Sequence, residues 1–459
     1  MIPFFILTKR NIKIEVKLKN IIVFCLVGII SSTLFSQPKT PDWANTATIY
    51  EVNIRQYTPE GTFNAFQNHL PRLKELGVDI LWLMPINPIG EVNRKGKLGS
   101  YYSVKNYTEI NPEFGSKKDF KNLVDEAHKL GMYLIVDWVA NHTAWDNPWV
   151  KAYPDFYTKD SVGNFVPPIA DWADVIDLNY DNKQLWSEMT NALKYWVKEF
   201  NIDGYRCDVA GMVPIEFWNQ VRYELDNIKP VFMLAEWETP ELHEKAFEMT
   251  YAWETHRMMN DIYKGSKTAN DFKKLILSDQ IKFQDYAFRM QFTSNHDENT
   301  WNGTEFERLG EAVEMFAVLT YVIPGMPLIY NGQEVGLNRR LEFFEKDLID
   351  WKESKFTHLY SQLNQLKKTN KALLNKNFGS NIEYISLPGN ENILGLIREN
   401  GEDMVIAIFN MSQNDVDINI NLEELNGLYN DFTNNSQIEI KGMLTTNLQA
   451  WSYRLFYKN

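Results

Sequence analysis

The sequence is poor in cysteine, in positive charge and in long apolar runs, and each shortage excludes a class of protein. Cys25 and Cys207 are the only cysteines among 459 residues, so a disulfide-framed fold is excluded. Lys and Arg number 47 against 60 Asp and Glu, and a net charge of −13 leaves no basic footprint for nucleic acid or an anionic membrane surface. No Gly-rich phosphate loop follows the first predicted strand, which argues against a dinucleotide-binding fold. We expect no organic cofactor.

The longest apolar run near the amino terminus is too short for a membrane span. Lys17 and Lys19 precede Ile21–Ile30, whereas a span needs about 20 residues. We therefore expect residues 1–36 to be a signal peptide, with export to the periplasm or the medium and no stable membrane insertion afterwards. Its removal would change the net charge from −13 to −17, because it holds five basic residues and one Glu. An uncleaved membrane anchor is the alternative.

The chain itself is rich in aromatic residues (14%) and has an ordinary globular share of hydrophobic ones (44%). Between about 42 and 369, short apolar runs alternate with amphipathic helical patterns. Eight strands are predicted, at Ile49–Ile54, Ile80–Leu83, Tyr133–Val136, Gly204–Cys207, Val231–Leu234, Met249–Trp253, Arg289–Phe292 and Pro327–Tyr330. Repeated strand–helix units imply a parallel sheet, and eight of them favour an α/β fold closed as a (β/α)₈ TIM barrel.

Two segments depart from this alternation. Residues 143–178 are long, aromatic and contain several prolines, which indicates a small subdomain inserted after strand three. Beyond about 375 the apolar period changes to two, and Asn400-Gly401 is typical of a hairpin turn, so residues 376–459 are expected to form a C-terminal antiparallel β-sandwich. The catalytic barrel would then comprise residues 37–142 and 179–375.

Acidic residues lie at or shortly beyond the ends of four predicted strands, and the first of them is Asp137, directly after strand three. Asp208, Glu236 and Asp297 come after strands four, five and seven, and the carboxyl ends of barrel strands form the reacting face. Acetal cleavage needs one carboxylate at the anomeric carbon and one carboxylic acid at the leaving oxygen. Arg206 precedes Asp208 by two residues, so both point to the same side of the strand and the cation can keep the carboxylate ionised.

A single acid at a strand end can equally be a helix cap or part of a structural salt bridge. Three such acids, with Asn-His pairs beside two of the strands, favour the catalytic interpretation. Zinc is not indicated, because the histidines lack paired metal-ligand spacing. Glu241, Glu244 and Glu248 lie on one helical face and are expected to be solvated.

The motifs around these residues resemble the signature regions of the α-amylase superfamily, glycoside hydrolase family 13. The matching segments run from Asp137 to His142, from Gly204 to Asp208, from Ala235 to Trp237, from Phe292 to Asp297 and from Gly325 to Glu334. Val175–Asn179 resembles the motif that closes the family's inserted domain, and Ser100–Tyr107 resembles its loop after strand two. The resemblance covers about residues 42–459.

The resemblance implies roles for individual residues. Asp208 would be the nucleophile, Glu236 the acid and then base, and Asp297 the group that favours a distorted sugar. Arg206 would orient Asp208, and the residues expected to bind the sugar are Tyr102, His142 and His296. Asn141 and Asp177 match positions that often ligate a structural Ca²⁺, while two structural hydrogen bonds are the alternative.

These roles imply a retaining hydrolase that cleaves α-1,4-glucosidic bonds in starch-like glucans or maltooligosaccharides. A cyclomaltodextrinase-like, neopullulanase-like or transglycosylating relative has the same triad, and a catalytically silent glucan-binding protein is a more remote alternative. Gly211-Met212 stands where many starch-degrading members have Lys-His, so the leaving-group side of the cleft differs.

Overall fold

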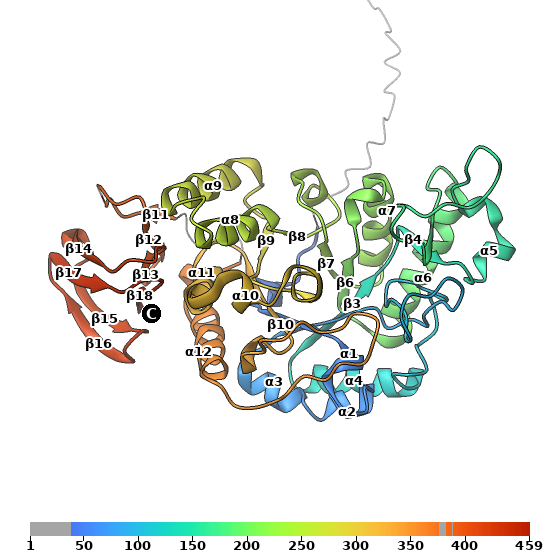
Figure 1. Cartoon of the computed structure of the whole chain (residues 1–459), viewed down its shortest axis with the longest axis horizontal. Coiled ribbons are helices and arrows are strands. Elements are labelled where there is room, and N and C mark those ends of the chain that lie inside the picture. Colours follow the sequence, from blue (N-terminus) through green and yellow to red (C-terminus); the bar gives the residue numbers. More distant parts are fainter. Residues whose placement is uncertain (1–37, 376–381, 388) are drawn as a thin grey trace, which may run out of the picture. The chain divides into compact units, whose positions relative to one another are not determined.

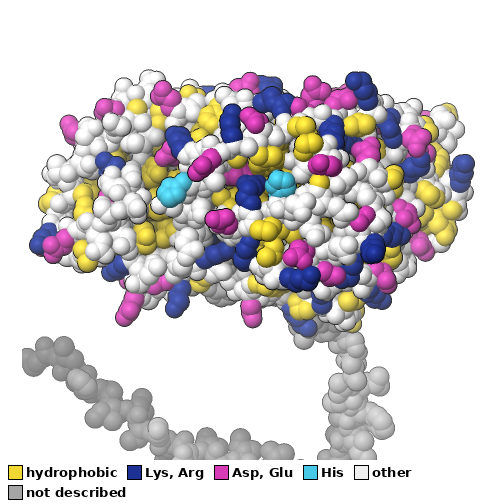
Figure 2. Space-filling view, turned by 90° about the horizontal axis from the view of Figure 1, so that it is seen from below, with side chains coloured by type: hydrophobic (Ala, Val, Ile, Leu, Met, Phe, Trp, Pro, Cys, Tyr) yellow, Lys and Arg dark blue, Asp and Glu magenta, His cyan; other side chains and the backbone are white. Residues whose placement is uncertain are grey.

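The computed structural model describes residues 38–375, 382–387 and 389–459. The predicted signal peptide, residues 1–36, lies outside these ranges and stays a prediction. Within them, no helix is long and apolar enough to cross a bilayer. On the face shown in Figure 2, acidic and basic side chains are interspersed.

A closed barrel of eight parallel strands forms the centre of the molecule, as the alternating pattern predicts (Figure 1). The strands follow each other around the barrel in the order β1, β2, β3, β6, β7, β8, β9 and β10. Their bounds are β1 Ile49–Val52, β2 Ile80–Leu83, β3 Tyr133–Trp138, β6 Gly204–Cys207, β7 Phe232–Ala235, β8 Met249–Tyr251, β9 Phe288–Gln291 and β10 Met326–Tyr330. These residues are almost all buried, since the strands pack on the barrel interior on one side and on helices on the other.

Helices cover the outside of the barrel. Their bounds are α1 Ile54–Tyr57, α2 Phe63–Gln67, α3 Leu70–Leu76, α4 Lys117–Lys129, α6 Lys183–Phe200, α7 Ile215–Asp226, α8 Trp253–Tyr263, α9 Ala269–Lys282, α10 Glu305–Leu309, α11 Val313–Val322 and α12 Lys355–Thr369. Helix α4 begins at a capping box in which Ser116 and Asp119 satisfy each other's backbone N–H groups. Glu248, expected to be solvated, is instead buried against Arg222 (2.7 Å), because it lies at the start of a barrel strand and not on a helix.

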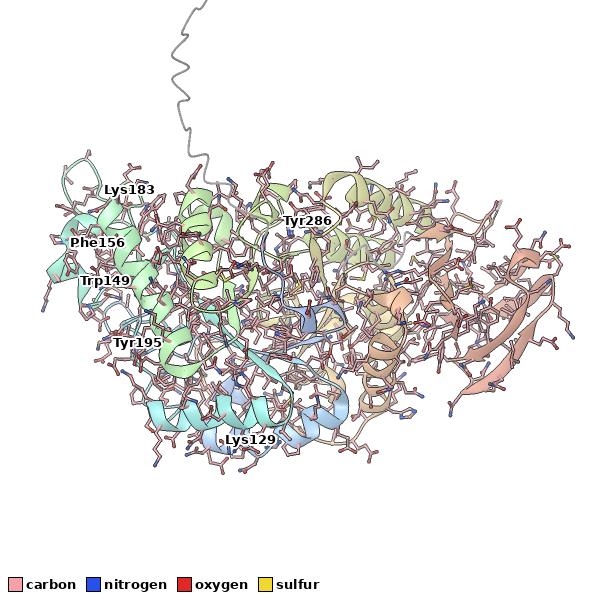
Figure 3. The ribbon with its side chains drawn as sticks, turned by 180° about the vertical axis from the view of Figure 1, so that it is seen from behind. Lys129, Trp149, Phe156, Lys183, Tyr195 and Tyr286 are labelled. Atoms are coloured by element: carbon pink, nitrogen blue, oxygen red, sulfur yellow. The ribbon has the colours of Figure 1, made fainter. Side chains whose placement is uncertain are left out.

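A short antiparallel pair interrupts the barrel between β3 and β6. Strands β4 His142–Ala144 and β5 Val175–Asp177 pair with each other, and helix α5 Trp149–Ala152 lies between them in the chain. Figure 3 shows Trp149 and Phe156 close together in this segment, and their rings meet edge to face at 5.7 Å. Most of the aromatic residues here therefore pack on one another as a small core.

The C-terminal part is the predicted antiparallel sandwich. A six-stranded sheet in the order β11-β12-β13-β18-β15-β16 faces the pair β14-β17 across an apolar core that includes Ile406, Ile418 and Phe456. The bounds are β11 Glu383–Tyr384, β12 Ile393–Asn400, β13 Asp403–Asn410, β14 Val416–Asn421, β15 Gly427–Asp431, β16 Ser436–Ile440, β17 Met443–Leu448 and β18 Tyr453–Lys458. Asn400 pairs with Asp403 across a two-residue turn, so the predicted hairpin is confirmed.

One glycine determines how strand β6 fits into the barrel. A Cβ atom on Gly204 would lie 1.8 Å from the carbonyl oxygen of Phe232 in β7, well inside contact distance. Only glycine allows this approach of the two backbones. Strand β6 carries Arg206 and leads into Asp208, so the close contact sets the position of both side chains.

Candidate active site

The guanidinium of Arg206 lies at the centre of the carboxyl ends of the barrel strands. It is fully buried and donates from Nη1 to Asp137 Oδ1 and to Asp208 Oδ1, both at 2.9 Å. Its Nη2 lies 2.7 Å from Glu236 Oε1, and its Nε donates to the Tyr251 hydroxyl at 3.1 Å. One cation therefore holds side chains from β3, β7 and β8 together with Asp208 at the end of its own strand.

Asp208 and Glu236 reach solvent only in part, with side chains 9% and 11% exposed. Glu236 Oε2 accepts a hydrogen bond of 2.8 Å from the backbone N–H of Val209, the residue after Asp208. Val209 has a φ of +35°, a strained conformation for a β-branched residue. This strained peptide joins the end of β6 directly to the acid at the end of β7.

Negative charge exceeds positive charge in this site. Burial raises the pKa of Asp208 well above its ordinary value, and the neighbouring Glu236 raises it further, while Arg206 lowers it. Burial likewise raises the pKa of Asp137 to about 6 despite its contact with Arg206. Crowded carboxyl groups in a site of low polarity favour retention of a proton by one of them.

A second cation, His296, connects Asp297 to Glu51 of strand β1. Its Nδ1 lies 2.5 Å from Glu51 Oε1, and its Nε2 lies 2.8 Å from the Tyr102 hydroxyl and 3.3 Å from Asp297 Oδ2. Burial disfavours the charged ring, but Asp297 and Glu51 outweigh burial and raise the pKa of His296 to about 9. Asp297 itself is 36% exposed and is the most accessible of the three acids.

His142 has the opposite electrostatic environment. Burial lowers its pKa to about 3, and the Asn141 amide lies 3.2 Å from its Nδ1, so the ring is neutral. Its ring meets that of Trp172, a half-exposed residue of the inserted segment, at 5.5 Å. His142 can therefore donate or accept a hydrogen bond without adding charge.

The two residues predicted to ligate calcium lie close together. Asn141 precedes β4, whose His142 pairs with Asp177 of β5, and Asp177 accepts a hydrogen bond of 2.6 Å from Thr158. In the part of the chain that is described, no three His, Cys, Asp or Glu side chains form a group that could hold a metal ion. One carboxylate and one amide fall short of the six to eight oxygens that Ca²⁺ takes, so backbone carbonyls and water would have to provide the rest.

Several residues of the site were missed in the sequence, although the predicted residues around Arg206 and His296 do come together. Glu51 lies inside an apolar run as the single charged residue of β1, and that position is the signal that could have identified it.

Asp137 was noted at a strand end without a role, yet it also accepts hydrogen bonds from Trp82 Nε1 (3.2 Å) and the Tyr102 hydroxyl (3.0 Å). Phe343 lies parallel to Tyr102, with ring centres 6.1 Å apart, and comes from a loop without any periodic pattern.

Comparison with known proteins identifies this arrangement. Residues 35–166 and 169–369 match the model of the alpha amylase catalytic domain. The chain belongs to the alpha-amylase family. It is an amylase-type hydrolase with the barrel, the insertion after β3 and the C-terminal sandwich that the sequence predicted.

Individual relatives are distant but cover most of the chain. Alpha-amylase 2 of Dictyoglomus thermophilum is 27% identical over 438 residues, which span 86% of this chain and 73% of that protein. A 4-alpha-glucanotransferase of Thermotoga neapolitana is 26% identical over 332 residues, 63% of this chain and 71% of that protein. The crystal structure of an alpha-amylase from Lactobacillus plantarum has a TM-score of 0.81 at 30% identity and covers 90% of this chain and 99% of that one. A maltogenic alpha-amylase from Thermotoga neapolitana has a TM-score of 0.82 at 27% identity, with 90% and 98% covered.

The Glu51–His296 pair generates a pH prediction. Replacing Glu51→Gln removes one of the two carboxylates that raise the pKa of His296, so that pKa should fall below its value of about 9. An imidazole has a pKa of about 6.5 in the unfolded chain, so this pair stabilises the fold fully below pH 6.5, and the effect is lost as pH rises through 9.

The measurement is an NMR titration of the His296 ring nitrogens, with the exposed Glu244→Gln as the control. A neutral His296 at pH 7 in the unmodified protein would contradict the assignment.

Proposed function

We propose that this protein is a retaining glycoside hydrolase that cleaves α-1,4-glucosidic bonds in starch-like glucans or maltooligosaccharides. The observation that carries the proposal is the shared guanidinium of Arg206, which holds Asp208 and Glu236 side by side at one rim. Retaining enzymes use two carboxyl groups about 5 Å apart, whereas inverting enzymes keep a wider gap for a water molecule. A pair held by adjacent nitrogens of one guanidinium suits the retaining geometry.

In the first step the Asp208 carboxylate attacks the anomeric carbon while Glu236 donates its proton to the leaving oxygen. The C–O bond to the leaving sugar breaks, and a covalent glycosyl–Asp208 ester forms. Arg206 holds Oδ1 of the Asp208 carboxylate in place and favours the ionised form of this group. Glu236 lies within reach of the same leaving oxygen, because Arg206 and the backbone N–H of Val209 hold its carboxyl group beside Asp208.

In the second step Glu236 acts as a base. It removes a proton from water, the water oxygen attacks the anomeric carbon, and the ester bond to Asp208 breaks with retention of the anomer. Asp297 is exposed enough to accept hydrogen bonds from sugar hydroxyls, and charged His296 holds its carboxylate in position. Tyr102, held by hydrogen bonds of its hydroxyl group, and neutral His142 complete the sugar-binding set.

The catalytic proposal predicts the effect of two isosteric replacements. Asp208→Asn and Glu236→Gln should each lower kcat on maltoheptaose by at least about 1,000-fold, because nucleophile and acid cannot replace each other. Reducing-sugar release and a thermal melt measure activity and folding together, with the exposed Glu241→Gln as the control.

Near-normal activity of either variant would contradict the mechanism. If the unmodified protein binds α-glucans but releases no reducing sugar, the catalytically silent alternative takes its place.

The leaving-group side of the cleft is built around Trp237. The ring of Trp237 lies directly over Gly211, where an added Cβ atom would come 2.1 Å from it. Only glycine therefore fits at position 211, because any side chain there would clash with the ring of Trp237, the residue after Glu236. Trp237 and Met212 are each 38% exposed, so an apolar surface takes the place of the Lys-His pair of many relatives. Such a surface can stack on a leaving or an acceptor sugar, so we infer that transfer to a second saccharide is the second candidate activity.

The Trp237 surface predicts a change in reaction outcome. Trp237→Ala should lower the ratio of transfer to hydrolysis products from concentrated maltotriose several-fold, and Trp237→Phe should retain most of it, because the ring supplies the contact. Chromatography of products over time measures this ratio. Equal product ratios in both variants and in the unmodified protein would exclude an acceptor site here and favour simple hydrolysis.

Calcium and export are further proposals that rest on the family resemblance and the sequence. If Ca²⁺ binds through Asn141 and Asp177, a chelator should lower Tm by several degrees, added Ca²⁺ should restore it, and Asp177→Asn should abolish the response. A Tm that is insensitive to chelator contradicts the calcium prediction. Export to the periplasm or the medium stays a prediction from residues 1–36.

A further inference from the structure

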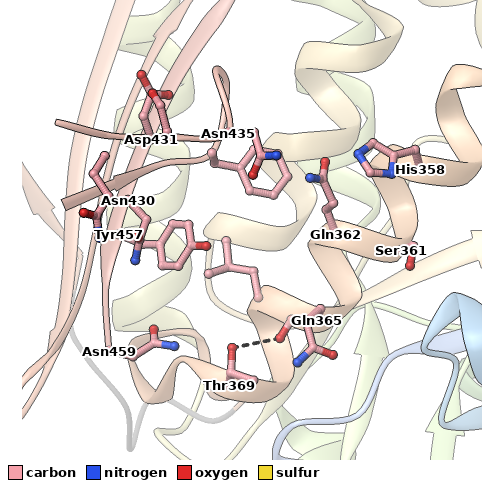
Figure 4. Close-up of a pocket in the computed structure, with 14 residues that line it drawn as sticks. His358, Ser361, Gln362, Gln365, Thr369, Asn430, Asp431, Asn435, Tyr457 and Asn459 are labelled. Carbon is pink, nitrogen blue, oxygen red and sulfur yellow. Dashed lines mark hydrogen bonds between the residues drawn. The ribbon is translucent and has the colours of Figure 1, made fainter.

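A groove far from the acids runs along helix α12. Its first part is a cavity of about 700 Å³ between the C-terminal half of α12 and the strands β15, β16 and β18 (Figure 4). His358 and Ser361 line this cavity and also a second one of about 420 Å³ that continues past Trp351. From His358 to Thr369 the helix rises by roughly 16 Å, which is long enough for several sugar rings.

The lining of the larger cavity is polar but almost uncharged. Five of its side-chain amides form no hydrogen bond with any described residue: Gln362 and Asn430 are half-buried, and Gln365, Asn435 and Gln437 are exposed to solvent. Asp431 is its one acidic side chain, and that carboxylate already accepts hydrogen bonds from Asn434. The lining of this larger cavity contains no Lys or Arg, so it is unsuited to phosphate or other anions, whereas Arg72, Glu75, Lys352 and Glu353 line the smaller cavity.

Aromatic rings lie beside these free amides. Phe432 and Tyr457 are half-buried in the larger cavity. In the smaller cavity the indole of Trp351 is held by a hydrogen bond of 2.6 Å from its Nε1 to the Tyr57 carbonyl and by Arg72 over its ring at 4.7 Å. Amides that both donate and accept, beside the partly exposed rings of Phe432 and Tyr457, match a ligand with many hydroxyl groups and apolar ring faces.

We propose that this groove is a second saccharide site, which binds a neutral α-glucan chain away from the catalytic carboxylates. The choice of an α-linked glucan rests on the proposed function, whereas the polyhydroxy character of the ligand rests on the groove itself. None of the residues that line it belongs to the catalytic set. A glucan held here would keep a long substrate attached to the enzyme between cuts.

The test removes two amides from α12 without weakening the helix. Gln362→Ala/Gln365→Ala changes residues one turn apart to the best helix former, so folding should be unaffected. Gln184→Ala/Gln280→Ala, on other helices, is the matched control. Both pairs are made in a Glu236→Gln background, which prevents digestion of the probe, and maltoheptaose binding is measured by calorimetry.

Two binding sites are expected in the Glu236→Gln protein and in the control, and one in the Gln362→Ala/Gln365→Ala variant. With Glu236 restored, this variant should lose several-fold activity on granular starch and keep its activity on maltotriose within twofold. A single site in every protein, with starch activity unchanged, would overturn the proposal.

Two further outcomes separate this site from the proposed function. Hydrolysis of maltoheptaose with a single binding site rejects the groove and leaves the catalytic proposal standing, whereas no hydrolysis and no binding of any α-glucan rejects both. Equal binding of cellohexaose in the groove would reject an α-glucan as its ligand.

Discussion

The burial of one guanidinium among three acidic side chains is the constraint on which the rest of the site depends. Arg206 has no access to water, so its charge must be balanced by Asp137, Asp208 and Glu236, and these must come from three neighbouring strands of the barrel. The closed barrel brings these three strands side by side, and the close contact of Gly204 with Phe232 fixes the position of β6, the strand that carries Arg206. The Arg206 side chain therefore links the barrel fold, which positions it, to the acidic groups that it holds in the active site.

A second layer of interactions determines how the accessible acid is held. Asp297 is bound on one side by His296, which in turn contacts Glu51 inside β1, so the strand that begins the barrel supports the acid that follows β9. His142 remains neutral at the mouth of the inserted segment. In the same site His296 is therefore charged and His142 is neutral, because His296 lies beside carboxylates whereas His142 lies beside an amide.

Much of this could be predicted from the sequence, because each barrel strand is a short apolar run and the three catalytic acids lie within a few residues of the ends of such runs. Glu51 and Trp82 were missed because they lie inside strands, where a sequence pattern does not show which side faces the barrel interior. Strands β15, β16 and β17 of the sandwich cannot be located individually in the sequence, because their exposed positions are polar or irregular and only the partner strand fixes their register. Glu248 was misjudged because helical spacing was applied across residues that do not form a helix.

The crowding of acids around Arg206 also has a thermodynamic consequence for the whole barrel. Five carboxyl groups, those of Glu51, Asp137, Asp208, Glu236 and Asp297, surround two cations, and several of them are buried. Repulsion among them opposes folding, so the aromatic and aliphatic packing elsewhere must offset it. Substitutions that reduce this repulsion would raise thermal stability but lower catalytic activity. Stabilising substitutions are therefore best tolerated at positions away from the active site.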